Sequence, residues 1–146
     1  MKITLKIEQR FEEPEVILQA PQKTEEIEQI VNFVQELGQD KRLTVKKDEE
    51  VYRIEAQEFD RIYIENRKVW LERGKERYAS SLRLYEVLEL LPSPFLQISQ
   101  SEIINTHRIH HLQQTPNGLV QIFMKNGAET YSSRRYLKAI KEKLSL

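Results

Sequence analysis

The chain has 146 residues, a length that suits one domain or one domain with a short extension. It contains no cysteine, which excludes disulfides, thiolate metal ligands and a cysteine nucleophile. The N-terminus lacks the unbroken apolar stretch of a signal peptide, and no run approaches the roughly 18 apolar residues of a membrane span. We therefore expect a soluble cytoplasmic protein with no cofactor, no metal ion and no small-molecule substrate.

The formal net charge is zero, but the charges are unevenly distributed. From Ile98 onward seven residues are basic and three are acidic, so this part carries +4 and the preceding part carries −4. An acidic first part and a basic last part are expected if only the last part meets phosphate groups. Random clustering gives the same asymmetry, so the charge pattern alone decides little.

The first part of the chain predicts a small β-β-α extension over residues 1–43. Residues 2–8 alternate between polar and apolar side chains, which indicates a half-buried strand, and residues 16–18 indicate a second one. Thr24 is suited to cap a helix, and apolar residues recur at helical spacing through residues 24–37. Such a unit buries too little area to fold alone, so we expect it to dock on the rest of the chain or to dimerise.

From residue 44 the pattern changes to many short strands joined by tight turns. One short helix is expected over residues 82–90, where Pro92 ends it, and a terminal helix over residues 135–144. Asn126-Gly127 is the strongest hairpin signal of the chain. This order is typical of a mostly β domain with some α, and fits neither a helix-turn-helix protein nor a βαβ enzyme. Strands are expected around 43–45, 51–54, 61–65, 68–72, 77–79, 96, 103, 109, 119–124 and 129–131.

Four stretches of this second part occur in a recognisable order: Arg61 to Lys68, Tyr78 to Glu86, Phe95 to Asn105, and Asn126 to Lys138. The last two are the specific ones. They combine a serine-rich loop before Ile-Ile-Asn with Asn-Gly and then Ser-Arg-Arg-Tyr. Over residues 44–146 the sequence resembles the LytTR (LytR/AlgR-type) DNA-binding domain family.

The resemblance implies an elongated set of small antiparallel sheets with a short mid-domain helix and a C-terminal helix. Residues 1–43 look like the extension of stand-alone members that lack a receiver domain. The implied function is that of a bacterial, response-regulator-like transcription regulator that binds double-stranded DNA at a direct-repeat site. The implied partners are a second copy, giving a homodimer at least on DNA, and a membrane protein that restrains the regulator.

The resemblance also implies that three loops enter successive major grooves. The first loop carries Asn66, Arg67 and Lys68, the second carries Ser99, Gln100 and Ser101, and the third carries Tyr131, Ser133, Arg134 and Arg135. Relatives often have Arg, His or Asn where this chain has Gln100, which affects the base that is read.

The chemistry of these side chains agrees with contacts to DNA. The guanidinium of Arg135 is a planar fork that fits guanine O6 and N7, and Gln100 can pair with adenine N6 and N7. Ser99 and Ser101 can donate to phosphates, whereas Arg134 points to phosphate or to solvent. Without the resemblance, the Ser-Gln-Ser segment would be interpreted as an ordinary polar turn, and the two arginines as solvent-exposed residues at the N-terminus of a helix.

Other conspicuous residues have structural interpretations. Ser133 is as suited to cap the terminal helix as to contact DNA. Asn105 is expected to satisfy backbone groups at a strand turn, and Trp70 to face the core or a partner. The three histidines lie in a strand region, where their spacing does not match that of a shared metal site. We therefore expect no metal ion at His107, His110 and His111.

No glycine-rich phosphate loop or nucleophile elbow occurs, so we expect no enzyme. Two functions remain open. One is a sequence-specific DNA-binding regulator, and the other is a protein-protein interaction or adaptor module of the same fold that does not read DNA. Binding of a regulator through several phosphates should weaken by orders of magnitude as salt rises, which separates the two.

Overall fold

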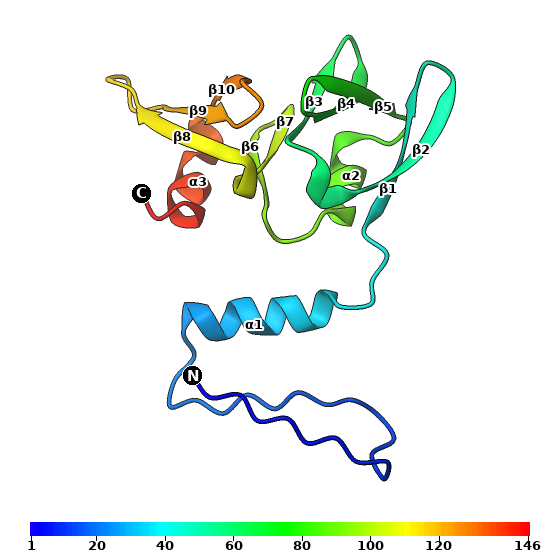
Figure 1. Cartoon of the computed structure of the whole chain (residues 1–146). Helices are drawn as coiled ribbons and strands as arrows, with labels where there is room; N and C mark the ends of the chain where they lie inside the picture. Colours follow the sequence, from blue (N-terminus) through cyan, green and yellow to red (C-terminus); the bar gives the residue numbers. More distant parts are fainter. The chain divides into compact units, whose positions relative to one another are not determined.

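The computed structural model describes residues 1–146, which divide into two compact units, Met1–Gln39 and Asp40–Leu146 (Figure 1). The first unit contains helix α1 (Glu25–Glu36). The Thr24 hydroxyl accepts a hydrogen bond from the Ile27 backbone N–H at 3.4 Å, so the predicted helix and its cap are confirmed. None of the residues of α1 is buried.

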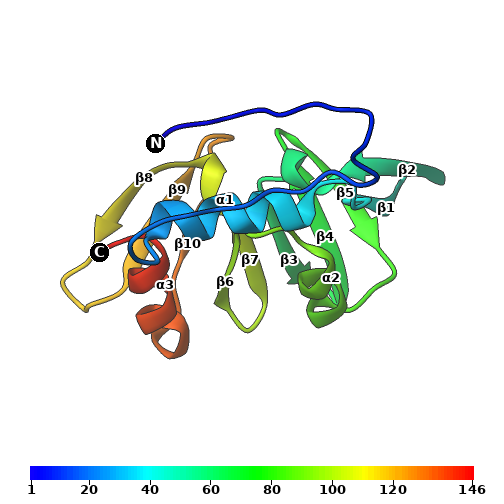
Figure 2. The same ribbon diagram turned by 90° about the horizontal axis from the view of Figure 1, so that it is seen from below.

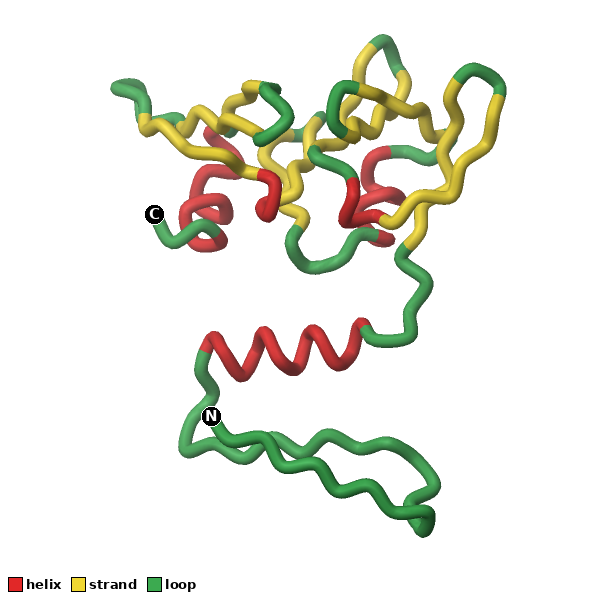
Figure 3. The backbone as a smooth tube through the Cα atoms, viewed as in Figure 1, coloured by secondary structure: helices red, strands yellow, loops and turns green.

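The two strands expected in this unit do not form. Residues 2–8 and 16–18 belong to no helix or strand and are drawn as loop in Figure 3. An alternating segment becomes a strand only when its backbone groups pair with a neighbouring strand, and two strands without a third, or a helix to pack on, are marginal in water. The prediction of a β-β-α extension is therefore wrong in its β part.

The second unit is mostly β, as the sequence pattern predicts, and every strand pair is antiparallel, as the family resemblance implies. Seven strands form one sheet in the order β2-β1-β5-β4-β3-β7-β6, and three form a second sheet in the order β10-β9-β8. The strands are β1 (Arg42–Lys47), β2 (Glu50–Glu55), β3 (Arg61–Glu65), β4 (Lys68–Arg73), β5 (Glu76–Ser80), β6 (Phe95–Ser99), β7 (Glu102–Asn105), β8 (Ile109–Gln114), β9 (Val120–Met124) and β10 (Glu129–Tyr131).

Two α-helices and three short 3₁₀ turns complete the second unit. They are α2 (Leu84–Leu90), α3 (Leu137–Lys143), η1 (Ala56–Glu58), η2 (Thr106–Arg108) and η3 (Arg134–Tyr136). The last helix therefore begins with a 3₁₀ turn and becomes α-helical two residues later than expected. None of the helices is long and apolar enough to span a membrane.

Two apolar clusters hold the sheets in place. In the first, Leu84 and Val87 of α2 are buried together with Ile62 of β3 and Leu71 of β4. In the second, Ile140 of α3 is fully buried beside side chains from β6, β7 and β9. Each such side chain contributes about 1.5–3 kcal/mol by leaving water.

The β6–β7 hairpin contributes to both clusters. Ile103 belongs to the first and its neighbour Ile104 to the second, and both are fully buried. Successive side chains of a strand point to opposite faces of the sheet, so one strand serves two cores. The loop that joins β6 to β7 is therefore anchored between the two sheets.

Candidate nucleic-acid interface

The three loops with the predicted site residues lie in a row. The Ile64 backbone N–H, at the end of β3, donates to the Ser101 carbonyl at 3.0 Å, which joins the first loop to the second. The Ser133 backbone N–H donates at 2.9 Å to the carbonyl of Ile98 in β6, which joins the third loop to the strand that leads into the second. In Figure 2 the β6–β7 hairpin extends to the lower edge of the second unit, where α2 and α3 also lie.

The first loop is a two-residue hairpin turn. Glu65 and Lys68 pair as the last residues of β3 and β4, and Asn66 and Arg67 between them have φ of 53° and 64°. Positive φ at both central residues matches a type I′ turn, which suits the twist of the two strands. Arginine rarely adopts this conformation, so the backbone conformation of Arg67 is unfavourable by about 1 kcal/mol. The side chains of Asn66, Arg67 and Lys68 are all exposed.

The second loop presents one long polar side chain between two short ones. Gln100 and Ser101 are exposed, and Ser99 is half-buried. The Ser99 hydroxyl accepts from the Ser101 backbone N–H at 3.3 Å and lies 3.4 Å from the Ser101 hydroxyl. These contacts fix the turn and leave the Gln100 amide free to meet another molecule.

The third loop places two adjacent cations at the start of the terminal helix. Arg134 and Arg135 open η3, and both are exposed without an ion pair. Tyr131, at the end of β10, is 53% exposed. The structure thus brings exposed residues of all three predicted loops onto neighbouring segments.

The serines of the third loop have structural surroundings. Ser133 occupies the cap position of η3, but its hydroxyl makes no capping hydrogen bond and is buried without a partner. The alternative that Ser133 caps the terminal helix is therefore wrong, because its side chain turns inward. The neighbouring Ser132 is buried, and its hydroxyl accepts from the Val120 backbone N–H at 3.0 Å. Ser132 anchors the loop to β9.

A polar cluster that the sequence did not reveal lies behind the loops. Arg61 of β3 forms ion pairs with Glu72 at 3.0 Å and with Glu102 at 3.5 Å. Thr130 of β10 donates to the other Glu102 oxygen at 2.9 Å, so the cluster joins the two sheets. Burial raises the pKa of the Glu102 carboxyl, and the nearby Arg61 guanidinium partly offsets this effect. Because Glu102 directly follows the second loop, the cluster fixes the position of that loop.

Asn105 has the structural role predicted from the sequence. It is 1% exposed, and its amide nitrogen donates to the carbonyls of Gln57 and Phe59, each at 3.1 Å. Its side-chain oxygen accepts from the His107 backbone N–H at 3.0 Å. One amide therefore satisfies three backbone groups where β7 ends.

The remaining conspicuous residues lie outside the row of loops. Trp70 is half-buried, donates to the Glu65 carbonyl at 3.1 Å and carries the Arg77 guanidinium 3.9 Å from its ring. His110 and His111 are exposed, with their Nδ1 atoms 2.8 Å apart, and His111 stacks on Phe123. No group of three or more metal-ligating side chains occurs among the described residues 1–146.

Comparisons with known proteins show the family and the fold. A family model described as "LytTr DNA-binding domain" matches residues 49–145. The chain therefore belongs to the LytTr DNA-binding domain family. The LytTr DNA-binding domain of a methyl-accepting/DNA response regulator from Bacillus cereus has the same fold, with a TM-score of 0.69. The two sequences are 18% identical, and the match covers 75% of this chain and 100% of that one.

Relatives similar over the whole length come from Staphylococcus aureus. Proteins named as uncharacterized HTH-type transcriptional regulators in strains MSSA476 and NCTC 8325 are each 36% identical over 146 residues, which is 100% of this chain and 99% of theirs. The corresponding protein of strain MRSA252 is 35% identical over the same span. In the present chain strands separate the three α-helices from one another, so no helix-turn-helix forms.

Proposed function

We propose that this protein is a cytoplasmic, sequence-specific DNA-binding transcription regulator whose three loops read successive major grooves of a direct-repeat site. Family membership and the names of the relatives support a DNA-binding regulator rather than an enzyme. The observation that carries the proposal is the row of loops joined by two backbone hydrogen bonds, with Arg67, Gln100 and Arg135 exposed on it.

Each loop has its own role in this proposal. Arg135 contacts guanine O6 and N7 through its planar fork, and Gln100 contacts adenine N6 and N7. Arg67 contacts a base or a phosphate, while Lys68 and Arg134 contact phosphates and set the register on the duplex. The remaining predicted contacts to sugar or phosphate come from Asn66, Ser99, Ser101 and Tyr131. Ser133 offers no free donor to DNA, because its hydroxyl is buried and its backbone N–H donates to the Ile98 carbonyl.

The test begins with selection of bound duplexes from a random pool, followed by affinity measurements on the selected site and on random DNA. Arg135→Ala should cost roughly 1–3 kcal/mol on the selected site and little on random DNA. Arg134→Ala is the matched control, because the loss of a phosphate contact weakens both duplexes alike. If Arg135→Ala also weakens both alike, the assignment of Arg135 to base readout is wrong.

The same measurements distinguish a regulator from an interaction module of this fold. A regulator that neutralises several phosphates loses affinity steeply as salt rises, with a slope of about −0.9 per phosphate contact. An interaction module that does not read DNA would show no selected sequence and only weak binding. That outcome would leave the fold intact and reject the proposed function.

We further propose that the protein is a homodimer on DNA and that residues 1–43 make the contact. The extension carries large apolar side chains in contact with water, since Ile3, Leu5 and Ile7 are 85%, 81% and 90% exposed, and Phe33 of α1 is 66% exposed. A second copy would cover this surface, and a restraining membrane protein is the further partner implied by family resemblance. Sedimentation with and without DNA tests the dimer, and a monomer under both conditions at high concentration would reject it.

A further inference from the structure

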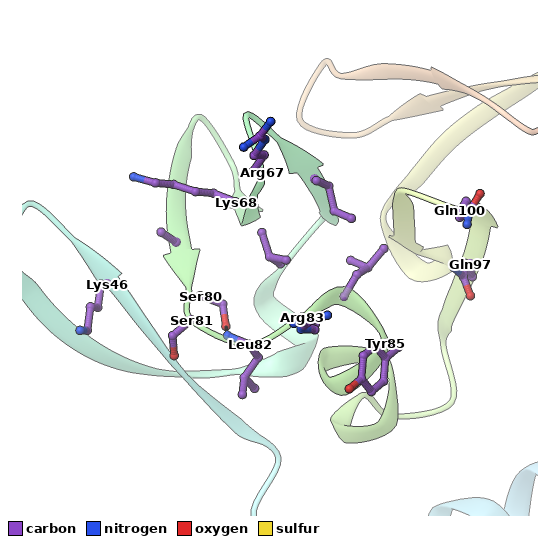
Figure 4. A pocket seen from close by; sticks show the side chains of 14 residues that line it. Lys46, Arg67, Lys68, Ser80, Ser81, Leu82, Arg83, Tyr85, Gln97 and Gln100 are labelled. Carbon is purple, nitrogen blue, oxygen red and sulfur yellow. Dashed lines mark hydrogen bonds between the residues drawn. The ribbon is translucent and has the colours of Figure 1, made fainter.

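A groove of about 960 Å³ lies beside the first loop, between the β3–β4 hairpin, the segment from β5 to α2, and the β6–β7 loop (Figure 4). Its floor includes apolar side chains such as Val69 and Leu84, and its rim is polar. Arg67 and Gln100 of the first two loops belong to the rim. The groove is therefore continuous with the row of loops.

The groove carries four cationic side chains and no carboxylate. They belong to Lys46, Arg67, Lys68 and Arg83, and none of them forms an ion pair within residues 1–146. Elsewhere on the same sheet the arginines have ion-pair partners, since Arg42, Arg53, Arg61, Arg73 and Arg77 each lie within 4.0 Å of a carboxylate oxygen. Among the strand residues of this sheet, the cations without an ion pair are therefore Lys46 and Lys68, and both line the groove.

Two of these cations, Lys46 and Arg83, lie outside the three predicted loops. Lys46 is exposed on β1, where it pairs with Ala79 of β5. The backbone of Arg83 is fixed, because its N–H donates to the Glu86 carboxylate at 3.1 Å while the Leu82 N–H next to it donates to the Ser80 hydroxyl at 3.1 Å. The guanidinium of Arg83 remains exposed and unpaired, so a rigid backbone presents a free cation.

We propose that this groove binds the phosphates of duplex DNA beside the point where the first loop meets the major groove, and that Lys46 and Arg83 are phosphate contacts. The proposal rests on the proposed function of the loops. The cations stand around the rim and do not converge on one point (Figure 4), an arrangement that suits a row of phosphates better than a single small anion. Phosphate contacts of this kind set position and add affinity without reading sequence.

The test uses a double variant that carries both Lys46→Gln and Arg83→Gln. Its DNA affinity is compared with that of the wild type across a salt series, on the selected duplex and on a random duplex of equal length. Each lost phosphate contact should reduce the steepness of log affinity against log salt by about 0.9. At about 0.1 M salt the variant should therefore bind both duplexes roughly 60-fold more weakly, and the difference should vanish towards 1 M. The ratio of selected to random binding should not change.

The matched control is the double variant Arg42→Gln with Arg53→Gln, which removes the same charge from the β1–β2 hairpin. Both arginines pair with Asp40 at 3.1 Å, and the hydrogen bond from the Arg42 side chain lowers the pKa of Asp40 to about 2, so at the pH of the assay this carboxylate offsets one of their two positive charges. Neither arginine lines the groove. This control should keep the wild-type salt dependence. All four residues are exposed, so thermal unfolding should show that each variant remains folded.

The outcomes separate this inference from the proposed function. An unchanged salt dependence in the Lys46 and Arg83 variant overturns the groove as a phosphate site, while wild-type binding still supports the loops. An equal loss in the control variant also overturns it, because general charge then explains the effect. A changed sequence preference would assign these residues to base readout instead. A wild type without salt-dependent binding rejects the function of the loops and the groove together.

Discussion

Replacing Asn105 by alanine removes three hydrogen bonds at the end of β7. The bond to the Phe59 carbonyl is fully buried, and those to the Gln57 carbonyl and from the His107 N–H are partly buried. A buried group left without a partner costs about 1–3 kcal/mol, whereas water can partly replace a partner at a more exposed group. We therefore expect Asn105→Ala to lower the free energy of unfolding by about 2–4 kcal/mol, a large share of the roughly 5–15 kcal/mol typical of a domain.

Urea unfolding followed by circular dichroism measures this loss. With an m-value of about 2 kcal/mol/M, in the middle of the range for small proteins, the midpoint should fall by about 1–2 M urea while m stays constant. Asn117→Ala, at an exposed turn position, is the control and should change stability by less than about 1 kcal/mol. A midpoint shift below about 0.5 M for Asn105→Ala would refute the reasoning, because the three backbone groups would then have other partners.

Asn105→Asp tests whether the stability of the folded chain rises or falls on acidification. The carboxylate keeps the acceptor for the His107 N–H but faces two carbonyl oxygens, so at neutral pH this variant should be less stable than Asn105→Ala. These carbonyls favour the protonated carboxyl and raise its folded pKa above the unfolded value. The penalty is therefore present above the folded pKa and fades as pH falls through it. Stability that worsens on acidification, relative to the wild type, would contradict this account.

Three further predictions concern the loops, the polar cluster and the second core. Arg67→Gly removes a side chain from a residue with left-handed backbone conformation, so the free energy of unfolding, measured in urea, should change by less than about 1 kcal/mol. The DNA affinity, measured by titration, should fall. Because burial raises the pKa of Glu102, the wild type should gain stability relative to Glu102→Gln as pH falls towards the pKa that this carboxyl has in the unfolded chain. Equal differences in urea midpoint between the two proteins at about pH 5 and 7 would contradict this. Ile140→Ala should cost about 2–5 kcal/mol in thermal unfolding, because Ile140 is fully buried between α3 and the second sheet.

The sequence determined the elements of the second unit and the positions of its turns. Local rules were sufficient there: alternation marked the strands, and Asn126-Gly127 marked the β9–β10 hairpin. The same rules gave a wrong prediction for residues 2–8. An alternating pattern shows that a segment can form a strand, but it does not show that another strand is available to pair with it. The helix of the extension was predicted correctly because its hydrogen bonds are local.

Only the tertiary structure decided which residues meet. Arg61, Glu102 and Thr130 are far apart in sequence and form one cluster, and Lys46 and Arg83 come from different elements to line one groove. In Ile103-Ile104-Asn105 the sequence showed only two apolar residues and an amide. Packing places the first isoleucine in one core and the second in the other, and the amide bridges to η1. Such placements depend on strand order across the sheets, and the pairing of distant strands leaves no local pattern along the chain.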